Sequence, residues 1–276
     1  MKSGIEVDIS KCIHCASCVK DCMVKALKFN QDTGFPEMVA DGVKLCINCQ
    51  HCLAVCPAGA LSVNGVSAGN CHPVGALPDK EAFLNLIRQR RSVRRFKKEP
   101  LNRETLDILK NVLHWTPTGC NDHRLQFFIA GKEEIAEFRK VSDRWLRFLI
   151  KSGLMSLLVP RYRRYFDYIL SGADIIYREA PHLIVVMAPA KSPCCKTDQV
   201  IALTQFDLMA QTLGASTCWC GFAEYAFRLI PQLRKMISCP RGYRIGGVML
   251  FGKPAVKYFR ATQPPEFIVR ENIVGK

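Results

Sequence analysis

Residues 12–22 read CIHCASCVKDC and residues 46–56 read CINCQHCLAVC, so that four cysteines recur with identical gaps. Every cysteine of the first segment has a counterpart thirty-four positions later, and an Ala-Leu pair follows each segment, at 26–27 and at 60–61. Self-similarity at a fixed period indicates one structural unit that has been duplicated. We therefore treat the two segments as halves of a single module.

The spacing inside each copy predicts iron–sulfur ligation. Two-residue gaps let a tight loop place three thiolates around a cluster, and the fourth cysteine of such a run ligates the other cluster of a pair. Zinc sites are a poorer match, because they need CxxC pairs separated by a longer spacer. The sequence thus predicts two [4Fe–4S] clusters. Their ligands would be Cys12, Cys15, Cys18 and Cys56 for the first, and Cys46, Cys49, Cys52 and Cys22 for the second.

With these motifs, residues 1–66 resemble a bacterial two-cluster ferredoxin domain. Met23 departs from the family's usual proline, which the second copy retains as Pro57. This proline shapes a turn and supplies no ligand, so both cluster sites are expected to form. Such a small domain is expected to owe much of its folding energy to bound clusters. Its implied task is to move single electrons, so another part of the chain has to supply the substrate chemistry.

Composition places the chain among ordinary globular proteins of one or two domains, with 276 residues, 49% hydrophobic and 23% charged. Its fifteen cysteines are odd in number, which argues against a complete disulfide framework and for metal ligands in a reducing compartment. Glu6 and Asp8 stand where a signal peptide needs apolar residues, and no run approaches the ~18 apolar residues of a membrane span. We expect a cytoplasmic protein that makes no membrane contact.

The formal net charge of +15 invites a nucleic-acid interpretation. Cluster thiolates and a bound phosphate would lower this charge to about +9, since each oxidised cluster site contributes about −2. The remaining charge favours acidic partners or anionic ligands, and we expect no nucleic-acid partner.

A connector separates the module from the rest of the chain. The stretch 64–80 contains three glycines and two prolines, which places a linker at 67–80 between domains at 1–66 and 81–276. Asp79 is a suitable N-cap for the helix predicted after it.

That helix runs into a basic segment, RQRRSVRRFKK at 88–98. The segment admits three interpretations: a solvated face, a nucleic-acid patch or a phosphate cradle. A serine among arginines favours the third, because guanidinium forks and a hydroxyl together suit a terminal phosphate.

Two later segments extend the pattern. Residues 116–128 read TPTGCNDHRLQFF, a turn leading into a strand, and residues 203–214 read LTQFDLMAQTLG, a helix closing on glycine that continues as ASTCWCGF at 215–222. Over residues 80–262, the three segments together resemble the FMN-dependent nitroreductase family. The matching features are an arginine–serine phosphate motif, a Pro-Ser-Gly-x-Asn-like loop and an LGxxTxWxG loop.

The resemblance implies FMN as a cofactor and an intertwined homodimer with FMN at its interface. The implied fold class is α+β: the small ferredoxin-like two-cluster domain is followed by a nitroreductase-like mixed sheet with surrounding helices. Short apolar runs at 183–187 and 247–251, which alternate with longer amphipathic helices, agree with such a sheet.

Carried over position by position, the family's flavin contacts fall on four separate segments. They are Arg90, Arg91, Ser92 and Arg94 for the phosphate and ribityl chain, Thr118 and Asn121 for the isoalloxazine ring, Cys220 and Gly221 for backbone N–H groups near flavin N5, and Lys257 and Arg260 for the phosphate. His123 and Arg124 depart from the family's usual glutamine and proline, so this loop indicates no substrate preference.

The implied activity is that of a flavin- and iron–sulfur-dependent oxidoreductase, which passes electrons between the clusters and FMN to reduce a nitroaromatic, a quinone or a similar small organic acceptor. FMN is then the redox centre, and no side chain is assigned a catalytic role. The electron donor is a reduced ferredoxin or NAD(P)H, although no GxGxxG fingerprint is present. Two alternatives stay open: an NAD(P)H oxidoreductase whose clusters pass electrons out to an acceptor protein, and a redox sensor or electron store without turnover.

Two further features have ordinary interpretations. Aromatics alternate with arginines at 145–166, which fits a variable lid over the flavin pocket better than a membrane-surface or RNA-binding helix. The seven cysteines outside the repeat are expected to be mostly buried thiols without catalytic roles. They are Cys71, Cys120, Cys194, Cys195, Cys218, Cys220 and Cys239.

Overall fold

The computed structural model describes residues 4–153, 157, 160–266 and 268–270. The chain divides into two compact units. The first consists of residues up to Leu77 together with Pro117–His123, and the second consists of Pro78–Thr116 together with the chain from Arg124 onward.

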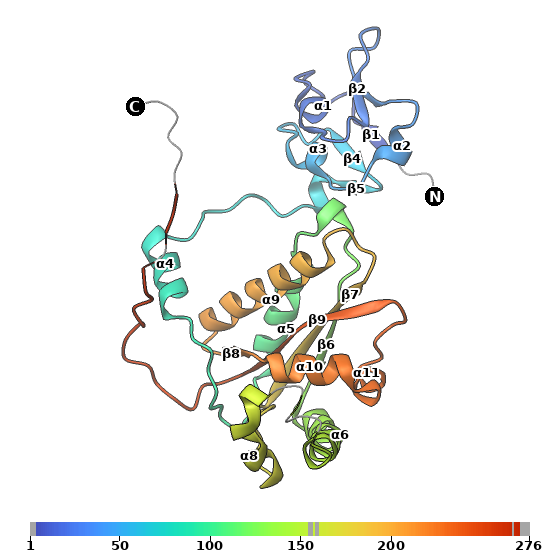
Figure 1. Ribbon diagram of the computed structural model, residues 1–276. Coiled ribbons are helices and arrows are strands. Elements are labelled where there is room, and N and C mark those ends of the chain that lie inside the picture. Colours follow the sequence, from blue (N-terminus) through green and yellow to red (C-terminus); the bar gives the residue numbers. More distant parts are fainter. Residues whose placement is uncertain (1–3, 154–156, 158–159, 267, 271–276) are drawn as a thin grey trace. The chain divides into compact units, whose positions relative to one another are not determined.

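The first unit is built from short strands and short helices (Figure 1). Its strands pair antiparallel in two small sheets, of order β1-β4-β5 and β2-β3. The strands are β1 (Ile5–Val7), β2 (Leu27–Phe29), β3 (Pro36–Met38), β4 (Leu61–Val63) and β5 (Val66–Ser67). The helical segments are α1 (Ser17–Asp21), α2 (Gly42–Leu45), α3 (His51–Ala54), η1 (Ala68–Asn70) and η2 (Gly119–Asn121).

The repeat in the sequence is also a repeat in the backbone. Residues at matching positions of the two copies adopt the left-handed conformation, which non-glycine residues rarely adopt. The matched pairs are His14 with Asn48 (φ 57° and 55°), Ala16 with Gln50 (58° and 60°), and Lys25 with Gly59 (53° and 59°). Because α1 begins directly after Ala16 and α3 directly after Gln50, both cysteine loops bend in the same way before they enter a helix.

The two copies share one small apolar core. Leu27 of β2, Leu53 of α3, and Leu61 and Val63 of β4 pack around Cys18 of α1. A core of this size contributes little folding energy by itself, which agrees with a domain that relies on bound clusters.

The second unit is a four-stranded sheet with helices on both faces (Figure 1). The strand order is β6-β7-β9-β8, and neighbouring strands pair antiparallel. A parallel component enters at the isolated bridge between Ser92 and Thr217 of β8. The strands are β6 (Gln126–Ala130), β7 (His182–Pro189), β8 (Ser216–Trp219) and β9 (Tyr243–Gly252).

The central strands β7 and β9 are buried on both faces, because successive residues along each strand point into opposite cores. Leu183 and Val185 of β7 pack in the core that α6, α10 and α11 cover, while Ile184 and Val186 pack in the core that α5 and α9 cover. The helices of this unit are α4 (Lys80–Gln89), α5 (Arg103–His114), α6 (Lys132–Lys151), α8 (Phe166–Leu170), α9 (Cys195–Thr212), α10 (Gly221–Leu229) and α11 (Pro231–Met236), with η3 at Pro160–Tyr165.

Local predictions from the sequence are confirmed in this unit, and so is the α+β fold class. The carboxylate of Asp79 caps α4 and accepts hydrogen bonds from the backbone N–H groups of Glu81 (2.9 Å) and Ala82 (3.0 Å). Helix α9 ends at Thr212, and Gly214 follows with a φ of +69°, the left-handed conformation that commonly closes a helix. The apolar runs predicted as strands lie within β7 and β9.

The segment 145–166, predicted to be a lid, joins the end of α6 to α8 through η3. Residues 154–156, 158 and 159 of it lie outside the described residues. Trp145 packs against the core, and its indole N–H donates to Gln232 Oε1 at 3.1 Å. Phe148, in contrast, is 67% exposed, so this segment presents apolar surface as well as arginines.

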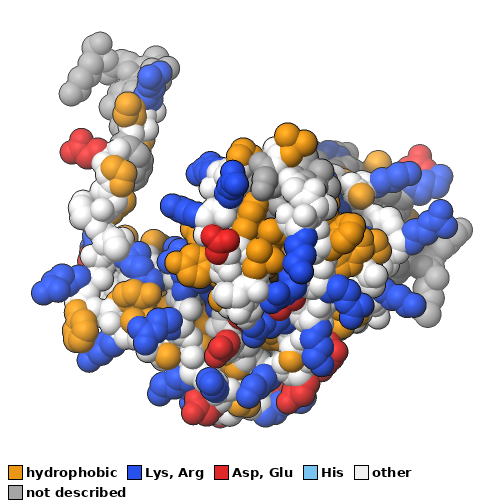
Figure 2. Space-filling view, turned by 60° about the horizontal axis from the view of Figure 1, so that its bottom comes forward, with side chains coloured by type: hydrophobic (Ala, Val, Ile, Leu, Met, Phe, Trp, Pro, Cys, Tyr) orange, Lys and Arg blue, Asp and Glu red, His pale blue; other side chains and the backbone are white. Residues whose placement is uncertain are grey.

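Basic side chains dominate the surface. In Figure 2, Lys and Arg side chains are spread over the visible face among fewer Asp and Glu, as the formal charge of +15 requires. Within the part of the chain that the structure describes, no helix is long and apolar enough to cross a membrane.

Candidate redox centres

Two hollows in the first unit are each lined by four cysteines. The first hollow is lined by Cys12, Cys15, Cys18 and Cys56. The second hollow is lined by Cys22, Cys46, Cys49 and Cys52. The structure therefore brings together the same two quartets that the crossed-ligand prediction names, in which the fourth cysteine of each copy joins the first three of the other.

The quartets have the chemistry of cluster ligands. All fifteen cysteines are free thiols, and both hollows are otherwise lined mainly by apolar side chains. Among the described His, Cys, Asp and Glu side chains, no three converge as ligands of a single metal ion. A [4Fe–4S] cluster is held by four cysteine thiolates around a cube, so its ligands surround a volume and do not meet at one point.

Burial governs the protonation of these thiols in the absence of metal. It raises the pKa of Cys52 to about 11 and also raises the pKa of Cys18. Hydrogen bonds from Ser17 lower the pKa of Cys15, which is exposed. Because cysteine ligates as the thiolate, cluster assembly has to release protons from the buried thiols.

Asn121 contacts the loop of the second quartet. Its side-chain amide donates hydrogen bonds to the carbonyl oxygens of Ile47 (3.1 Å) and Asn48 (3.0 Å), which lie between two cysteines of that quartet. Residues 117–123 belong to the first compact unit, although the chain on either side of them belongs to the second. A residue predicted to contact the flavin ring thus also anchors a cysteine loop.

The loop around Asn121 is held by its own hydrogen bonds. The imidazole Nε2 of His123 lies 2.7 Å from Asn121 Oδ1, and the His123 backbone N–H donates to Thr118 Oγ1 at 2.9 Å. Cys120, Asn121 and His123 all take the left-handed conformation. Thr118, the other residue predicted to contact the flavin ring, therefore fixes His123 and through it the amide of Asn121.

The arginines predicted to bind phosphate lie at and after the C-terminus of α4. Arg90 Nη1 lies 3.4 Å from the Asp207 carboxylate, and the two side chains are 34% and 4% exposed. Arg91 donates to the carbonyl oxygens of Arg90 (2.9 Å) and Arg88 (3.0 Å), so it caps the last turn of α4. Arg94 is exposed.

Asp207 ties the arginine–serine motif to β8. Its carboxylate accepts a hydrogen bond from the Thr217 hydroxyl and lies 3.4 Å from Gln211 Nε2. The backbone of Thr217 in turn bridges to Ser92 and accepts a hydrogen bond from the Val93 N–H at 2.8 Å. A buried carboxylate requires partners of this kind. Asp207 could not be predicted as a partner of Arg90, because nothing in the sequence of a helix shows which distant cation its side chain will meet.

Cys220 and Gly221 lie where β8 passes into α10. The Cys220 N–H donates to the Val248 carbonyl at 2.9 Å. Gly221 is the first residue of α10, and the first N–H groups of a helix have no acceptor within it. The Cys220 thiol donates to the Ile176 carbonyl at 3.1 Å. Burial raises the pKa of this thiol to about 11, so it stays protonated at neutral pH and is no nucleophile.

The chain after β9 runs alongside the arginine–serine motif. The backbone N–H of Ala255 donates to the Arg95 carbonyl at 2.9 Å. Lys257 and Arg260, predicted to lie toward the phosphate, follow this contact and are exposed.

Comparison with known families agrees with this geometry. Residues 11–60 match the model of the 4Fe-4S dicluster domain, and residues 87–253, more than half of the chain, match the model of the nitroreductase family. The chain belongs to the nitroreductase family. Both resemblances predicted from the sequence are confirmed: the chain combines a nitroreductase domain with a 4Fe-4S dicluster domain that precedes it. A search of the curated proteins found no match.

Solved structures share the fold of this nitroreductase-family chain. A nitroreductase with bound FMN from Desulfitobacterium hafniense DCB-2 gives a TM-score of 0.56 at 21% identity, covering 68% of this chain and 98% of that one. A nitroreductase with bound FMN from Bacteroides fragilis NCTC 9343 gives 0.56 at 17% identity, with 70% and 100% covered. Oxidized iodotyrosine deiodinase bound to FMN and 3-iodo-L-tyrosine gives 0.52 at 22% identity, with 69% and 98% covered.

One further residue of the nitroreductase-family unit fits an anionic cofactor. The Nε atom of Arg178 is buried and has no hydrogen-bond partner among the described residues. Because a buried donor without an acceptor costs free energy, this N–H group is available to an acceptor that the described residues do not supply. Arg178 is not among the residues predicted from the sequence. The available signal was a single arginine inside the largely apolar run 175–190.

Proposed function

We propose that this protein passes electrons between two [4Fe–4S] clusters and FMN and thereby reduces a small organic acceptor, such as a nitroaromatic or a quinone. The observation that carries the proposal is the pair of cysteine quartets, each around its own hollow, in a chain of the nitroreductase family. When bound, FMN supplies one- and two-electron redox chemistry, and each cluster supplies a one-electron site.

The cluster sites are proposed from their donor sets. Four thiols that surround an apolar hollow match the ligand number of a [4Fe–4S] cluster, and the matching left-handed residues give both loops the same path. In this proposal the first cluster is held by Cys12, Cys15, Cys18 and Cys56. The second is held by Cys46, Cys49, Cys52 and Cys22.

The proposed FMN site draws on cations and backbone donors from several segments. The residues that would hold the phosphate and the ribityl chain are Arg90, Arg91, Ser92 and Arg94, with Lys257 and Arg260 toward the phosphate. Those that would meet the ring are Thr118, Asn121, Cys220 and Gly221. Two findings refine their roles: the Cys220 N–H is already used in the sheet, which leaves Gly221 as the donor toward flavin N5, and Arg91 is engaged as a helix cap.

The acceptor is proposed only as a chemical class. Structures with this fold include nitroreductases with bound FMN and a deiodinase bound to FMN and 3-iodo-L-tyrosine, which is compatible with a small aromatic acceptor. Burial raises the pKa of the Cys220 thiol, and this side chain is assigned no catalytic role, because FMN would be the redox centre.

The proposed partners follow from charge and from the family. A protein with a formal charge of +15 attracts an acidic electron donor such as a reduced ferredoxin, and NAD(P)H is the alternative donor. We further propose a homodimer in the reducing cytoplasm, because none of the fifteen cysteines forms a disulfide bond.

Two measurements test the proposal on the anaerobically purified protein. The first is composition: we expect roughly eight irons, eight sulfides and one FMN per chain. The second is turnover with a nitroaromatic or quinone, using NADH, NADPH or reduced ferredoxin in separate reactions. Sustained consumption of reductant in proportion to enzyme supports the oxidoreductase. Full cofactor content without turnover with any donor would instead indicate a redox sensor or electron store, and reduction of an acceptor protein by NAD(P)H would make the clusters the exit.

A further inference from the structure

Arg178 stands in a turn that the rest of the fold holds rigidly. Arg178 and Glu179 are both in the left-handed conformation, with φ of 55° and 51°. The Asp174 carboxylate accepts hydrogen bonds from the backbone N–H groups of Tyr177 (2.8 Å) and Glu179 (3.0 Å), on either side of Arg178. Two backbone bonds to one carboxylate therefore fix the conformation that presents this arginine.

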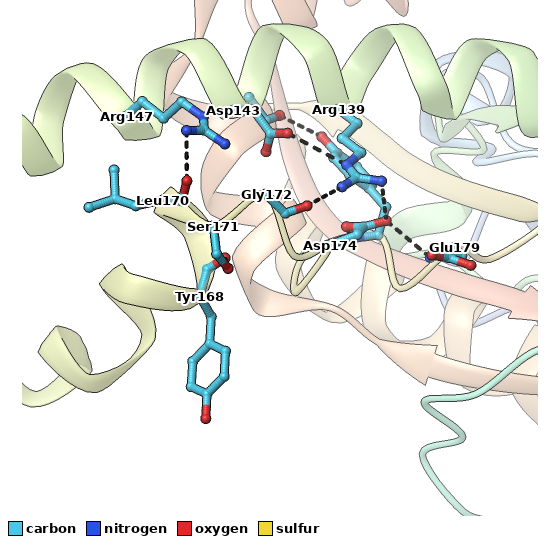
Figure 3. A network of polar contacts seen from close by, with 11 residues as sticks. Arg139, Asp143, Arg147, Tyr168, Leu170, Ser171, Gly172, Asp174 and Glu179 are labelled. Carbon is cyan, nitrogen blue, oxygen red and sulfur yellow. Dashed lines mark hydrogen bonds and ion pairs between the residues drawn. The ribbon is translucent and has the colours of Figure 1, made fainter.

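The carboxylate is itself anchored to α6. Arg139 of α6 lies 3.9 Å from Asp174 and donates to the carbonyl oxygen of Gly172 at 2.6 Å, and Asp143 pairs with Arg139 at 3.5 Å (Figure 3). The Asp174 side chain is only 6% exposed. Figure 3 shows this network between α6 and the segment that leads into the turn, with Arg139 between the two aspartates and Glu179 on the far side of Asp174. Helix α6 thus supports the turn that carries Arg178. A binding residue is preorganised when surrounding contacts hold it in this way.

The same turn is packed against the loop that leads from β8 into α10. The Cys220 thiol donates to the carbonyl of Ile176, two residues before Arg178. The buried Tyr177 hydroxyl lies 2.7 Å from Ser142 Oγ. Arg178 is therefore fixed next to the segment that carries Gly221, the proposed donor toward the flavin.

A second cation shares this neighbourhood. The pKa of the Cys218 thiol is raised by burial, and Arg178 and Arg94 both act against that rise. The backbone beside Arg94 is held against β8, because the Val93 N–H donates to the Thr217 carbonyl. The same strand leads into Cys220, whose thiol contacts the turn that carries Arg178. The Nε–H of Arg178 is buried and donates to no described residue.

We propose that Arg178 is an anion-binding residue of the flavin unit, which pairs with Arg94 to hold an oxyanion of the phosphate or carboxylate type. This inference rests on the proposed flavin function. A guanidinium with a free N–H in a fixed turn suits such a group, because it offers planar, charge-assisted hydrogen bonds. The oxyanion has two possible sources: the phosphate of FMN and a carboxylate on the acceptor.

The test compares the wild type with Arg178→Gln and Arg178→Lys, and uses Arg103→Gln as the matched control. Arg103 lies on α5 with its side chain 82% exposed, so its loss removes the same charge from the surface. Retained iron content and circular dichroism show that each variant is folded. Affinities for FMN and for riboflavin, which lacks the phosphate, are measured by flavin fluorescence after the cofactor has been removed. KM values are then measured for 4-nitrobenzoate and for the uncharged 4-nitrobenzamide.

A phosphate contact predicts that Arg178→Gln weakens FMN binding at least about tenfold and leaves riboflavin binding unchanged, with Arg178→Lys in between. A carboxylate contact predicts unchanged flavin affinities and a KM for 4-nitrobenzoate raised about tenfold, with no change for the amide. Either result supports the proposal. Equal effects on both flavins and both acceptors, or no effect beyond that of Arg103→Gln, overturn it. Failure of the wild type to bind FMN would instead overturn the proposed function itself.

Discussion

The carboxylate of Asp207 and the guanidinium of Arg90 form an ion pair at 3.4 Å that joins helix α9 to the arginine–serine motif. The same carboxylate accepts a hydrogen bond from the Thr217 hydroxyl of β8. Two consecutive elements, α9 and β8, therefore meet the distant arginine–serine motif at one buried acid. This acid gives the motif a fixed position before any phosphate binds.

Replacing Asp207 with asparagine tests this role. Asp207→Asn keeps an acceptor for the Thr217 hydroxyl and removes the charge that pairs with Arg90. We expect a loss of about 1–3 kcal/mol in the free energy of unfolding, because a partly buried cation is left without its counter-ion. Chemical denaturation followed by tryptophan fluorescence measures it. Asp107→Asn, in the exposed pair with Arg103, is the control and should cost less than about 0.5 kcal/mol. Equal losses in both variants would contradict the role of Asp207.

The phosphate assignment predicts a selective loss of flavin. Arg90→Ala combined with Ser92→Ala removes a charged donor and a hydroxyl, and we expect FMN affinity to fall at least about a hundredfold. Iron and sulfide content should stay at the wild-type level, because the cysteine quartets lie in the other compact unit. Flavin absorbance per iron in the purified variant gives the answer. A variant that retains stoichiometric FMN would refute the assignment.

Crossed ligation predicts which cysteine variants share a cluster. Cys22→Ser alone should remove roughly four irons per chain, the content of one cluster. Adding Cys46→Ser should cause no further loss, because both residues line the same hollow. Adding Cys12→Ser should remove the remaining iron, because Cys12 lines the other hollow. The opposite pattern of iron counts would show that each copy of the repeat holds its own cluster.

Asn121 should stabilise the second cluster in particular. Asn121→Ala deprives the Ile47 and Asn48 carbonyls of their donor, and we expect iron release to a chelator to become faster for about half of the iron. The loss of two hydrogen bonds is worth about 1–2 kcal/mol, or roughly a tenfold change in rate. His123→Ala leaves the amide donors of Asn121 in place and should have a smaller effect. Uniformly faster release from both clusters would argue against a local role.

His182 gives the second unit a dependence on pH. Burial lowers its pKa below the ordinary value of 6.5, and the neutral Nε2 accepts a hydrogen bond from the Leu101 N–H at 2.9 Å. His182 therefore binds a proton more readily in the unfolded chain than in the folded chain. Its contribution to the free energy of unfolding is fully present above about pH 6.5 and is lost as the pH falls below that value. His182→Gln, which retains an acceptor, should flatten the decline in melting temperature between pH 7.5 and 5.5. An unchanged decline would show that other groups cause it.

The sequence was most informative where function depends on local spacing. Two-residue gaps between cysteines define both quartets, and the backbone then repeats the same left-handed residues in each loop, at His14 and Asn48 for example. Asp79 as a helix cap and Gly214 as a helix end also follow from chemistry within a few residues. Interactions of this kind can be predicted without knowing the tertiary fold.

What the sequence could not predict depends on distant partners. Arg90 and Asp207 are 117 positions apart, and Asn121 reaches carbonyls 73 and 74 positions away. Arg178 is an ordinary arginine in the sequence and becomes notable only because its Nε is buried without an acceptor. Residues 117–123 belong by sequence to the flavin-domain pattern but pack within the first unit. Backbone carbonyls, which carry no sequence signal, make that contact.

We propose that the clusters and the flavin of this protein exchange electrons. The most direct measurement is an anaerobic single turnover: the protein is reduced with one donor, mixed rapidly with a nitroaromatic or quinone, and followed at the flavin band and at the broad cluster absorbance. We predict that both signals bleach together on reduction and recover together when the acceptor is added. Reduction and reoxidation of the flavin with the cluster absorbance unchanged would show that the clusters exchange no electrons with the flavin.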